Sequence, residues 1–202
     1  MFTGLACVMA ISACTQPKNS DRKVGDACDG CEAMFEGMPS QLDWQTKIAP
    51  VDEPGEVMTI SGTIYKADGK TPAAGVILYL YHTDNKGIYS PGPNQKVAKR
   101  HGHLRGWMKT DATGRYQFTS IRPASYPSRQ APQHIHPLIK EPGVSLYWID
   151  EFVFDDDELL SKDEISRNQK RGGSGVIHLT KNEKGEWTGK RDIILGMNIP
   201  NY

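Results

Sequence analysis

The chain has 202 residues, of which 38% are hydrophobic, and its 24 basic side chains balance 24 acidic ones. This length allows one domain with a sizeable hydrophobic core and is short for two. The zero net charge excludes proteins that bind through a broad basic surface, so we expect no nucleic-acid partner.

The first residues resemble a lipoprotein signal. Residues 2–11 are apolar but too few to span a bilayer, and the Ile-Ser-Ala-Cys sequence at 11–14 resembles the lipobox of bacterial lipoproteins. This resemblance implies a signal over residues 1–13 and lipidation of Cys14. The lipid would then be the only attachment to a membrane, in the bacterial cell envelope. An apolar N-terminus without a targeting role is the alternative. Residues 14–27 are polar and predict a tether.

The cysteines favour one oxidised pair. Of the four cysteines, Cys7 would leave with the signal and Cys14 would carry lipid, so Cys28 and Cys31 remain. In an oxidising envelope such a pair forms a disulfide. A zinc site would need two further ligands, and a redox motif would need a thioredoxin-like βαβ context. We therefore expect a structural disulfide within an N-terminal extension over residues 28–56.

From residue 57 onward the sequence is patterned as strands. Alternation over 57–65 and 116–121 predicts half-buried strands, and the continuous apolar run over 76–81 predicts a strand buried on both faces. Further strands are expected at 146–154, 176–180 and 187–195, with a single weak helical stretch at 155–169. Many short strands separated by turns predict an all-β fold. The pattern fits an antiparallel β-sandwich or barrel, and we expect the sandwich, with long loops and little helix over residues 57–202.

The strongest candidate for a metal site is the pair His134 and His136. Alternate residues of an extended chain point to one side, so both imidazoles can reach one ion. Upstream lie Tyr126 and Tyr89, and two tyrosinates with two neutral imidazoles would form a ligand set suited to Fe(III). A trivalent ion can ionise a tyrosine that otherwise keeps its proton until about pH 10. Each residue alone could be structural, and a cupin-type site that includes Glu141 is a rival.

The other histidines have weaker claims. His101 and His103 form a second His-x-His motif, but Gly102 and basic flanking residues place it on a loop. We expect it to lie at the rim of a substrate pocket and not to bind a metal. His82 and His178 are expected to be structural.

Several segments together resemble the intradiol ring-cleavage dioxygenases, which include the protocatechuate 3,4-dioxygenases and catechol 1,2-dioxygenases. The resemblance extends over about residues 57–200, and the matching segments are residues 62–64, 81–84, 87–89, 105–127, 134–136 and 154–157. The helical N-terminal segment of the catechol type has no counterpart, so the protocatechuate type is the nearer one.

The resemblance implies a non-haem Fe(III) held by Tyr89, Tyr126, His134 and His136. It also implies cleavage of a catechol-type ring by O2 between the two hydroxylated carbons. Tyr126 takes the catalytic role, because the substrate displaces it and it then serves as a base. The sequence leaves homo-oligomerisation open.

Two positions depart from the family pattern. Ala131 occupies the place of a usual arginine, and Glu151 the place of a usual glutamine. Arg129 and Arg122 are the candidates to replace the missing positive charge. We therefore expect Arg129 and Glu151 in the substrate pocket.

An alternative function comes from the first half of the domain. Residues 62–64, 71–76 and 110–116 also resemble non-catalytic prealbumin-like β-sandwich modules of surface proteins. A lipid-anchored binding module would fit that half of the chain, but it leaves His134 and His136 unexplained.

Overall fold

The computed structural model describes residues 21–28 and 30–202. In chain order its elements are η1 (Cys31–Phe35), β1 (Gln45–Lys47), β2 (Val57–Tyr65), β3 (Ile77–His82), η2 (Ala98–His101), β4 (Arg105–Lys109), β5 (Arg115–Ile121), β6 (His134–Lys140), β7 (Tyr147–Trp148), β8 (Phe152–Phe154), α1 (Lys162–Arg167), β9 (Val176–Ile177), β10 (Thr180–Lys181), β11 (Trp187–Lys190) and β12 (Ile193–Ile194).

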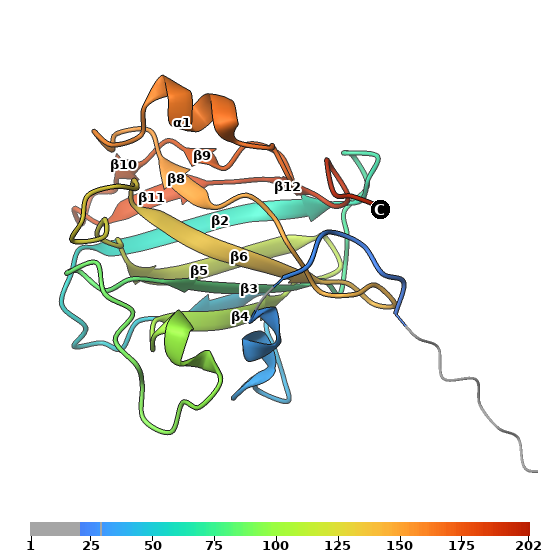
Figure 1. Cartoon of the computed structure of the whole chain (residues 1–202), viewed down its shortest axis with the longest axis horizontal. Coiled ribbons are helices and arrows are strands. Elements are labelled where there is room, and N and C mark those ends of the chain that lie inside the picture. The colour runs from blue at the N-terminus through green and yellow to red at the C-terminus, as the bar shows by residue number, and fades with distance from the viewer. Residues whose placement is uncertain (1–20, 29) are drawn as a thin grey trace, which may run out of the picture.

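The strands form two sheets that face one another as a sandwich (Figure 1). The first sheet has the order β1-β5-β2-β11-β10, with β12 also on β2, and the second has the order β4-β3-β6-β8-β9, with β7 on β6. The predicted all-β sandwich with little helix is confirmed. Pairing is antiparallel at the centre of each sheet. Strands β1, β9 and β12 pair in parallel with their neighbours, and β11 is parallel to β2 but antiparallel to β10, so both sheets are mixed.

The hydrophobic core lies between the two sheets. Alternate residues of each strand point into it, as the period of a half-buried strand requires. Ile60 and Phe118 from the first sheet, and Leu80, Ile135 and Phe152 from the second, are fully buried there. The site described below is therefore built on the opposite, outer face of the second sheet.

The outer face of the second sheet carries its own apolar cluster. Tyr79 on β3 and Leu138 on β6 pack there against Cys31 and Met34 of η1. The predicted burial of β3 on both faces is confirmed, because its leucines point into the sandwich and Tyr79 packs under η1. Cys28 and Cys31 are joined by a disulfide at the edge of this cluster.

The predicted tether is wrong for residues 21–27. Val24 is buried in the main core, the backbone of Arg22 pairs with Gly143 and Val144, and the amide of Gly25 donates to Pro200. One buried valine and several backbone hydrogen bonds hold a segment that is polar by composition. The predicted signal, the rest of the tether and Cys14 lie outside the described residues.

Several expected segments differ in detail. The expected strands at 146–154, 176–180 and 187–195 are each interrupted, and α1 is shorter than the expected helical stretch. Strand β6 runs through Pro137, which the sequence suggests as a break. Proline cannot donate to a neighbouring strand. Pro137 lies where the partner on one side changes from β8 to β7, so the missing donor falls at a gap.

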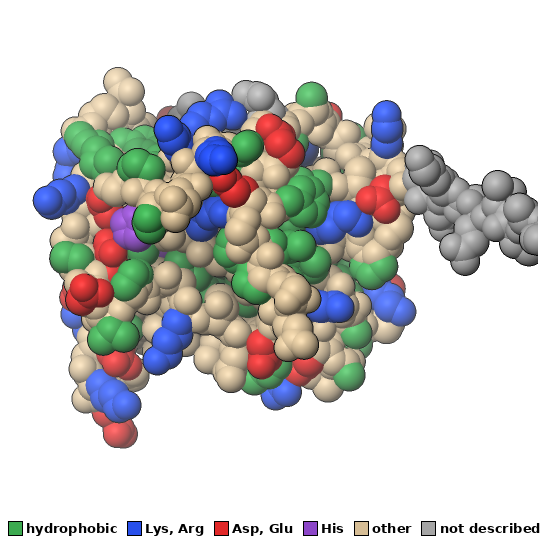
Figure 2. All heavy atoms as spheres, turned by 90° about the horizontal axis from the view of Figure 1, so that it is seen from below, with side chains coloured by type: hydrophobic (Ala, Val, Ile, Leu, Met, Phe, Trp, Pro, Cys, Tyr) green, Lys and Arg blue, Asp and Glu red, His purple; other side chains and the backbone are tan. Residues whose placement is uncertain are grey.

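The described surface mixes charges of both signs. On the face in Figure 2, Lys and Arg side chains are interspersed with Asp and Glu. Across the described residues, none of the helices has the length and apolar composition needed to cross a membrane.

Candidate metal centre

Strand β6 places His134 and His136 on the outer face of the second sheet. His134 pairs with Val153 of β8, and His136 pairs with Tyr81 of β3. Ile135 between them is fully buried in the main core, so the two imidazoles point the other way. The rings lie edge to face, 4.7 Å apart between centroids.

The structure brings the four predicted ligands together. Tyr126 Oη lies 2.9 Å from His134 Nε2, Tyr89 Oη lies 2.9 Å from His136 Nε2, and the two tyrosine oxygens are 3.1 Å apart. Two ligand atoms, each about 2.1 Å from one metal ion and at about right angles, lie about 3.0 Å apart. The spacing of these four atoms therefore fits neighbouring ligands of a single ion.

The remaining histidine nitrogens have partners that fix the tautomers. His134 Nδ1 donates to the carbonyl of Pro132 at 2.7 Å, and His136 Nδ1 lies 3.4 Å from the carboxylate of Glu151. Both Nε2 atoms are thereby left with a lone pair toward the tyrosines. Burial lowers the pKa of His134, and the hydrogen bond to His136 lowers the pKa of Glu151.

Proton counting supports a cation at this place. The four atoms make three short contacts, yet two neutral histidines and two phenols offer only two protons for them. With both histidines neutral, one of the three contacts therefore joins two lone pairs, and a bound cation would relieve this repulsion. Within the described residues, no three His, Cys, Asp or Glu side chains are arranged to hold a metal, so such an ion depends on Tyr89 and Tyr126.

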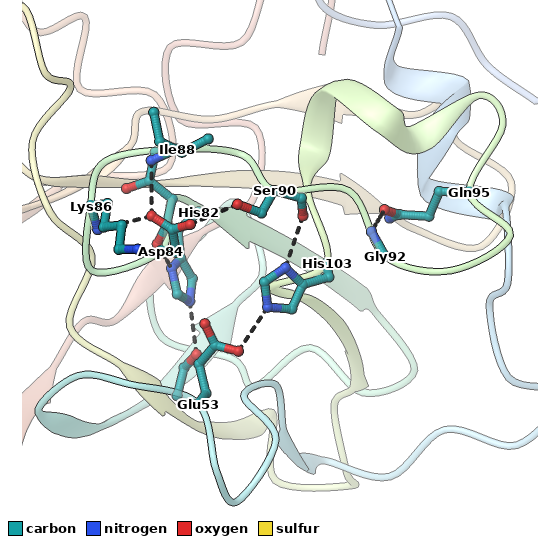
Figure 3. Close-up of polar contacts among 11 residues, drawn as sticks. Glu53, His82, Asp84, Lys86, Ile88, Ser90, Gly92, Gln95 and His103 are labelled. Atoms are coloured by element: carbon teal, nitrogen blue, oxygen red, sulfur yellow. Dashed lines mark hydrogen bonds and ion pairs between the residues drawn. The ribbon is translucent and has the colours of Figure 1, made fainter.

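Tyr89 lies in a loop that is organised by Asp84 at the end of β3. The Asp84 carboxylate accepts hydrogen bonds from the amides of Lys86 and Ile88, at 2.9 and 3.0 Å, and from the hydroxyl of Ser90 at 2.8 Å (Figure 3). Asp84 thus holds both neighbours of Tyr89 in the chain, Ile88 and Ser90. Burial alone would raise the pKa of Asp84. The hydrogen bonds from Ser90 and from the amides of Ile88 and Lys86 outweigh burial and lower this pKa below its usual value.

The loops that carry the two tyrosines are hydrogen-bonded to one another. Thr83 Oγ1 donates to the carbonyl of Ala124 at 2.7 Å, and the amide of Ala124 donates to Asp84. Gly87 has a φ of 77°, and a Cβ there would lie 2.1 Å from the carbonyl oxygen of Ser125. Only glycine allows this approach. Burial, and next the hydrogen bond to the neighbouring phenol, raise the pKa of Tyr89 well above its usual value, so without a cation it stays protonated.

A cavity of about 460 Å³ opens beside the four donor atoms. Tyr126, His134 and His136 line it, whereas Tyr89 does not. Its other walls combine apolar side chains with three carboxylates and two amides, namely Ala131, Pro132, Trp148, Val153, Leu160, Ile165 and Val176 with Asp150, Glu151, Glu164, Asn168 and Gln169. No lysine or arginine is found among these described lining residues.

The predicted pocket residues are divided. Glu151 and Ala131 line the cavity. Arg129 does not: its guanidinium pairs with Glu158, and its side chain is 62% exposed. Arg129 has a φ of 51° and lies in a turn in which its amide donates to the carbonyl of Tyr126. The local sequence does not predict this conformation. Arg122 is also engaged elsewhere, paired with Asp156.

His82 and His178 lie away from the candidate metal centre, whereas His101 lies near it. His82 is fully buried between Thr83 and Ser120, and burial lowers its pKa to about 4, which is consistent with a structural role. His178 is exposed and pairs with Asp155. His101 also lines a second cavity, of about 330 Å³, that shares His136, Trp148 and Glu151 with the first.

Sequence reasoning missed several residues around the site. Asp84 could have been noticed, because an aspartate three residues before Gly87 is a common turn signal. Trp148 and Ile165, which line the cavity from β7 and α1, carry no local signal and are brought there by the tertiary fold.

Comparison with known proteins agrees with this fold and site. Residues 33–185 match the protein-family model described as a dioxygenase. The chain is 31% identical over 114 residues to catechol 1,2-dioxygenase 1 of Acinetobacter lwoffii, covering 50% of this chain and 36% of that protein. It is 30% identical over 154 residues to chlorocatechol 1,2-dioxygenase of Rhodococcus opacus, covering 66% of this chain and 55% of that protein.

Solved structures show the same fold. The dioxygenase domain of a dioxygenase carbohydrate-binding protein fusion from Streptomyces sp. SirexAA-E superposes with a TM-score of 0.59 at 21% identity, over 80% of this chain and 94% of that one.

The two sequence relatives above are of the catechol type, whereas the sequence pattern placed the chain nearer the protocatechuate type. The family match covers most of the chain, and the chain belongs to the intradiol ring-cleavage dioxygenase family.

Proposed function

We propose that this protein is a non-haem Fe(III) dioxygenase that cleaves a catechol-type ring between its two hydroxylated carbons. Both atoms of O2 enter the product, the bond between those carbons breaks, and a muconate-type diacid forms. The observation that carries the proposal is the convergence of Tyr89, Tyr126, His134 and His136 within 2.9–3.1 Å contacts beside a cavity.

The residues of the site divide the work. Bound Fe(III) would supply Lewis acidity that ionises the phenols and the catechol and makes the ring electron-rich. Tyr126 lines the cavity, so its oxygen is placed to take a proton from a catechol hydroxyl. His134 and His136 would bind the ion through Nε2, because their Nδ1 atoms face Pro132 and Glu151. The apolar part of the wall holds the ring and limits access of water.

The test begins with the visible spectrum and iron content of the purified full chain. We expect one Fe(III) per chain and a burgundy colour from tyrosinate-to-iron charge transfer. Tyr126→Phe should shift or bleach this band and abolish oxygen uptake with catechols. A colourless protein that takes up no iron would favour the non-catalytic binding module. An iron-loaded protein without turnover on a panel of catechols would refute the enzymatic proposal.

We further propose that the protein is anchored in the bacterial cell envelope through a lipid on Cys14. The sequence at residues 11–14 and the Cys28–Cys31 disulfide, which suits an oxidising compartment, support this location. Cys14→Ser should release the protein from membranes into the soluble fraction. Unchanged membrane association of that variant would refute the lipid anchor.

A further inference from the structure

We propose that His101, Gly102 and His103 form a positioning motif that holds two of the metal-binding side chains, Tyr89 and His136, from behind. The inference rests on the proposed iron site and concerns residues that the proposed reaction does not use directly. The motif lies at the end of η2 and immediately before β4. His103 contacts Ser90, Gly102 contacts Tyr89, and His101 contacts Tyr81.

His103 holds the chain next to Tyr89. Its backbone amide and its Nδ1 both bond to the carbonyl oxygen of Ser90, each at 2.8 Å, and its Nε2 lies 2.8 Å from the carboxylate of Glu53 (Figure 3). Asp84 holds the hydroxyl of the same serine. Ser90 is therefore fixed at its side chain and at its carbonyl, and the residue before it is the ligand Tyr89.

Gly102 packs directly on the backbone of Tyr89. A Cβ at residue 102 would lie 3.1 Å from Tyr89 Cα and 3.2 Å from its carbonyl carbon, and Gly102 has a φ of 67°. A side chain at this position would therefore be strained and would push Tyr89 away from the site. Gln95 fixes the glycine in turn, donating to its carbonyl at 2.6 Å and accepting from the amide of Gly92.

His101 supports His136 through an intervening tyrosine. The ring of Tyr81 is stacked between the two imidazoles, 3.8 Å from His101 at an angle of 7° and 4.6 Å from His136 at 18°. Arg105 donates to Tyr79 Oη at 3.1 Å. The same hydroxyl is hydrogen-bonded to His101 Nδ1 at 2.9 Å and fixes the ring of His101. The stack restricts His136 on its face, whereas Glu151 restricts it at its edge.

Together these contacts let three consecutive residues restrain ligands from two separate parts of the chain. Partners behind a metal ligand set its orientation, and their removal typically lowers metal affinity or activity by about 10-fold to 100-fold. This gives the second His-x-His motif a role that neither rim position nor direct metal binding describes.

The test is a titration of the metal-free full chain with Fe(III), following the tyrosinate charge-transfer band. His103→Ala and His101→Ala should each raise the Kd for iron about 10-fold or more. His103→Ala should in addition shift the band, because it frees Tyr89. His101→Phe keeps a ring against Tyr81 and should retain affinity within about 3-fold of the wild type. His103→Asn keeps a donor for the Ser90 carbonyl and should be intermediate.

The matched control is His178→Ala, which removes an exposed histidine paired with Asp155 and should leave Kd and band unchanged. Thermal unfolding of each metal-free variant separates a local loss of positioning from failure to fold. If an alanine variant does not fold, His103→Asn, for which we expect an intermediate Kd, still decides the outcome. Folded His101→Ala and His103→Ala variants, or a folded His103→Asn variant, with the wild-type Kd and band would overturn this inference alone. A wild type that binds no Fe(III) would overturn the proposed function and the inference with it.

Discussion

Replacing Asp84 by alanine should loosen the loop that presents Tyr89. The carboxylate accepts two backbone hydrogen bonds and one from the hydroxyl of Ser90, all between 2.8 and 3.0 Å. Asp84 is only 9% exposed, so these bonds form in a largely water-excluded place. The variant would leave the two amide donors and the serine hydroxyl without their acceptor.

The expected effect on stability follows from these three bonds. A hydrogen bond to a charged group contributes about 1.5–3 kcal/mol, and a neutral one about 1 kcal/mol. Water that enters the space left by the carboxylate can satisfy part of the freed donors, so we expect a loss of about 3 kcal/mol in the free energy of unfolding. For a chain of this size that corresponds to a fall of about 6–12 °C in Tm.

The stability difference between the wild type and Asp84→Ala should depend on pH. Because the folded pKa of Asp84 is lowered, its contribution is fully present above the unfolded value of about 4 and is lost as the pH falls through the folded pKa. The difference in stability between the wild type and Asp84→Ala should therefore be largest near pH 7 and shrink below about pH 4.

The assay is urea unfolding at several pH values, together with the charge-transfer band of the iron-loaded protein. Asp68→Ala is the matched control, because Asp68 also accepts from two amides, of Lys70 and Thr71, and from one hydroxyl, but in a turn between β2 and β3. It should leave the band unchanged. An Asp84→Ala variant within about 0.5 kcal/mol of the wild type, with an unaltered band, would refute the reasoning.

Three further predictions concern the core, the cavity and the support of a ligand. Ile135 is fully buried between His134 and His136, so Ile135→Ala should reduce the free energy of unfolding by about 2–5 kcal/mol in urea titrations. Ile88 is 45% exposed, and Ile88→Ala should change that free energy far less. The described cavity lining holds carboxylates and no lysine or arginine, so the wild type should have a higher kcat/KM for catechol than for 3,4-dihydroxybenzoate. Ala131→Arg should reduce the ratio of these two kcat/KM values. An unchanged ratio would contradict this prediction. Glu151→Ala should weaken iron binding about 10-fold, measured by titration, and Glu151→Gln, which can still accept from His136, should weaken it less.

The candidate ligand residues were accessible from the sequence because their chemistry is local. His134 and His136 are two residues apart, so any extended conformation directs both imidazoles to one side. The order of Tyr89, Tyr126 and these histidines then carries the family resemblance. The strand pattern was informative for the same reason, since a two-residue period reports a buried face whatever the partner strand is.

Other expectations failed where the local sequence does not determine direction. Arg129 stands near the ligands in the sequence, but its turn conformation and its pairing with Glu158 take its charge away from the cavity. Residues 21–27 are polar by composition, yet Val24 and the backbone attach them to the sandwich. In both cases the deciding contact comes from a residue distant in the chain.

The sequence by itself determined the all-β class and the candidate pair His134 and His136, because alternation and spacing are properties of the extended chain alone. The family resemblance of the sequence implied Tyr89 and Tyr126 as the other two candidate ligands. Only the tertiary structure decided how these ligands are held. The pairing of β3 with β6 places Tyr81 beside His136, and the return of the chain at His101 and His103 supplies partners behind both Tyr81 and Tyr89. Those contacts join residues far apart in sequence, and no local pattern encodes a contact whose other half lies on a different strand.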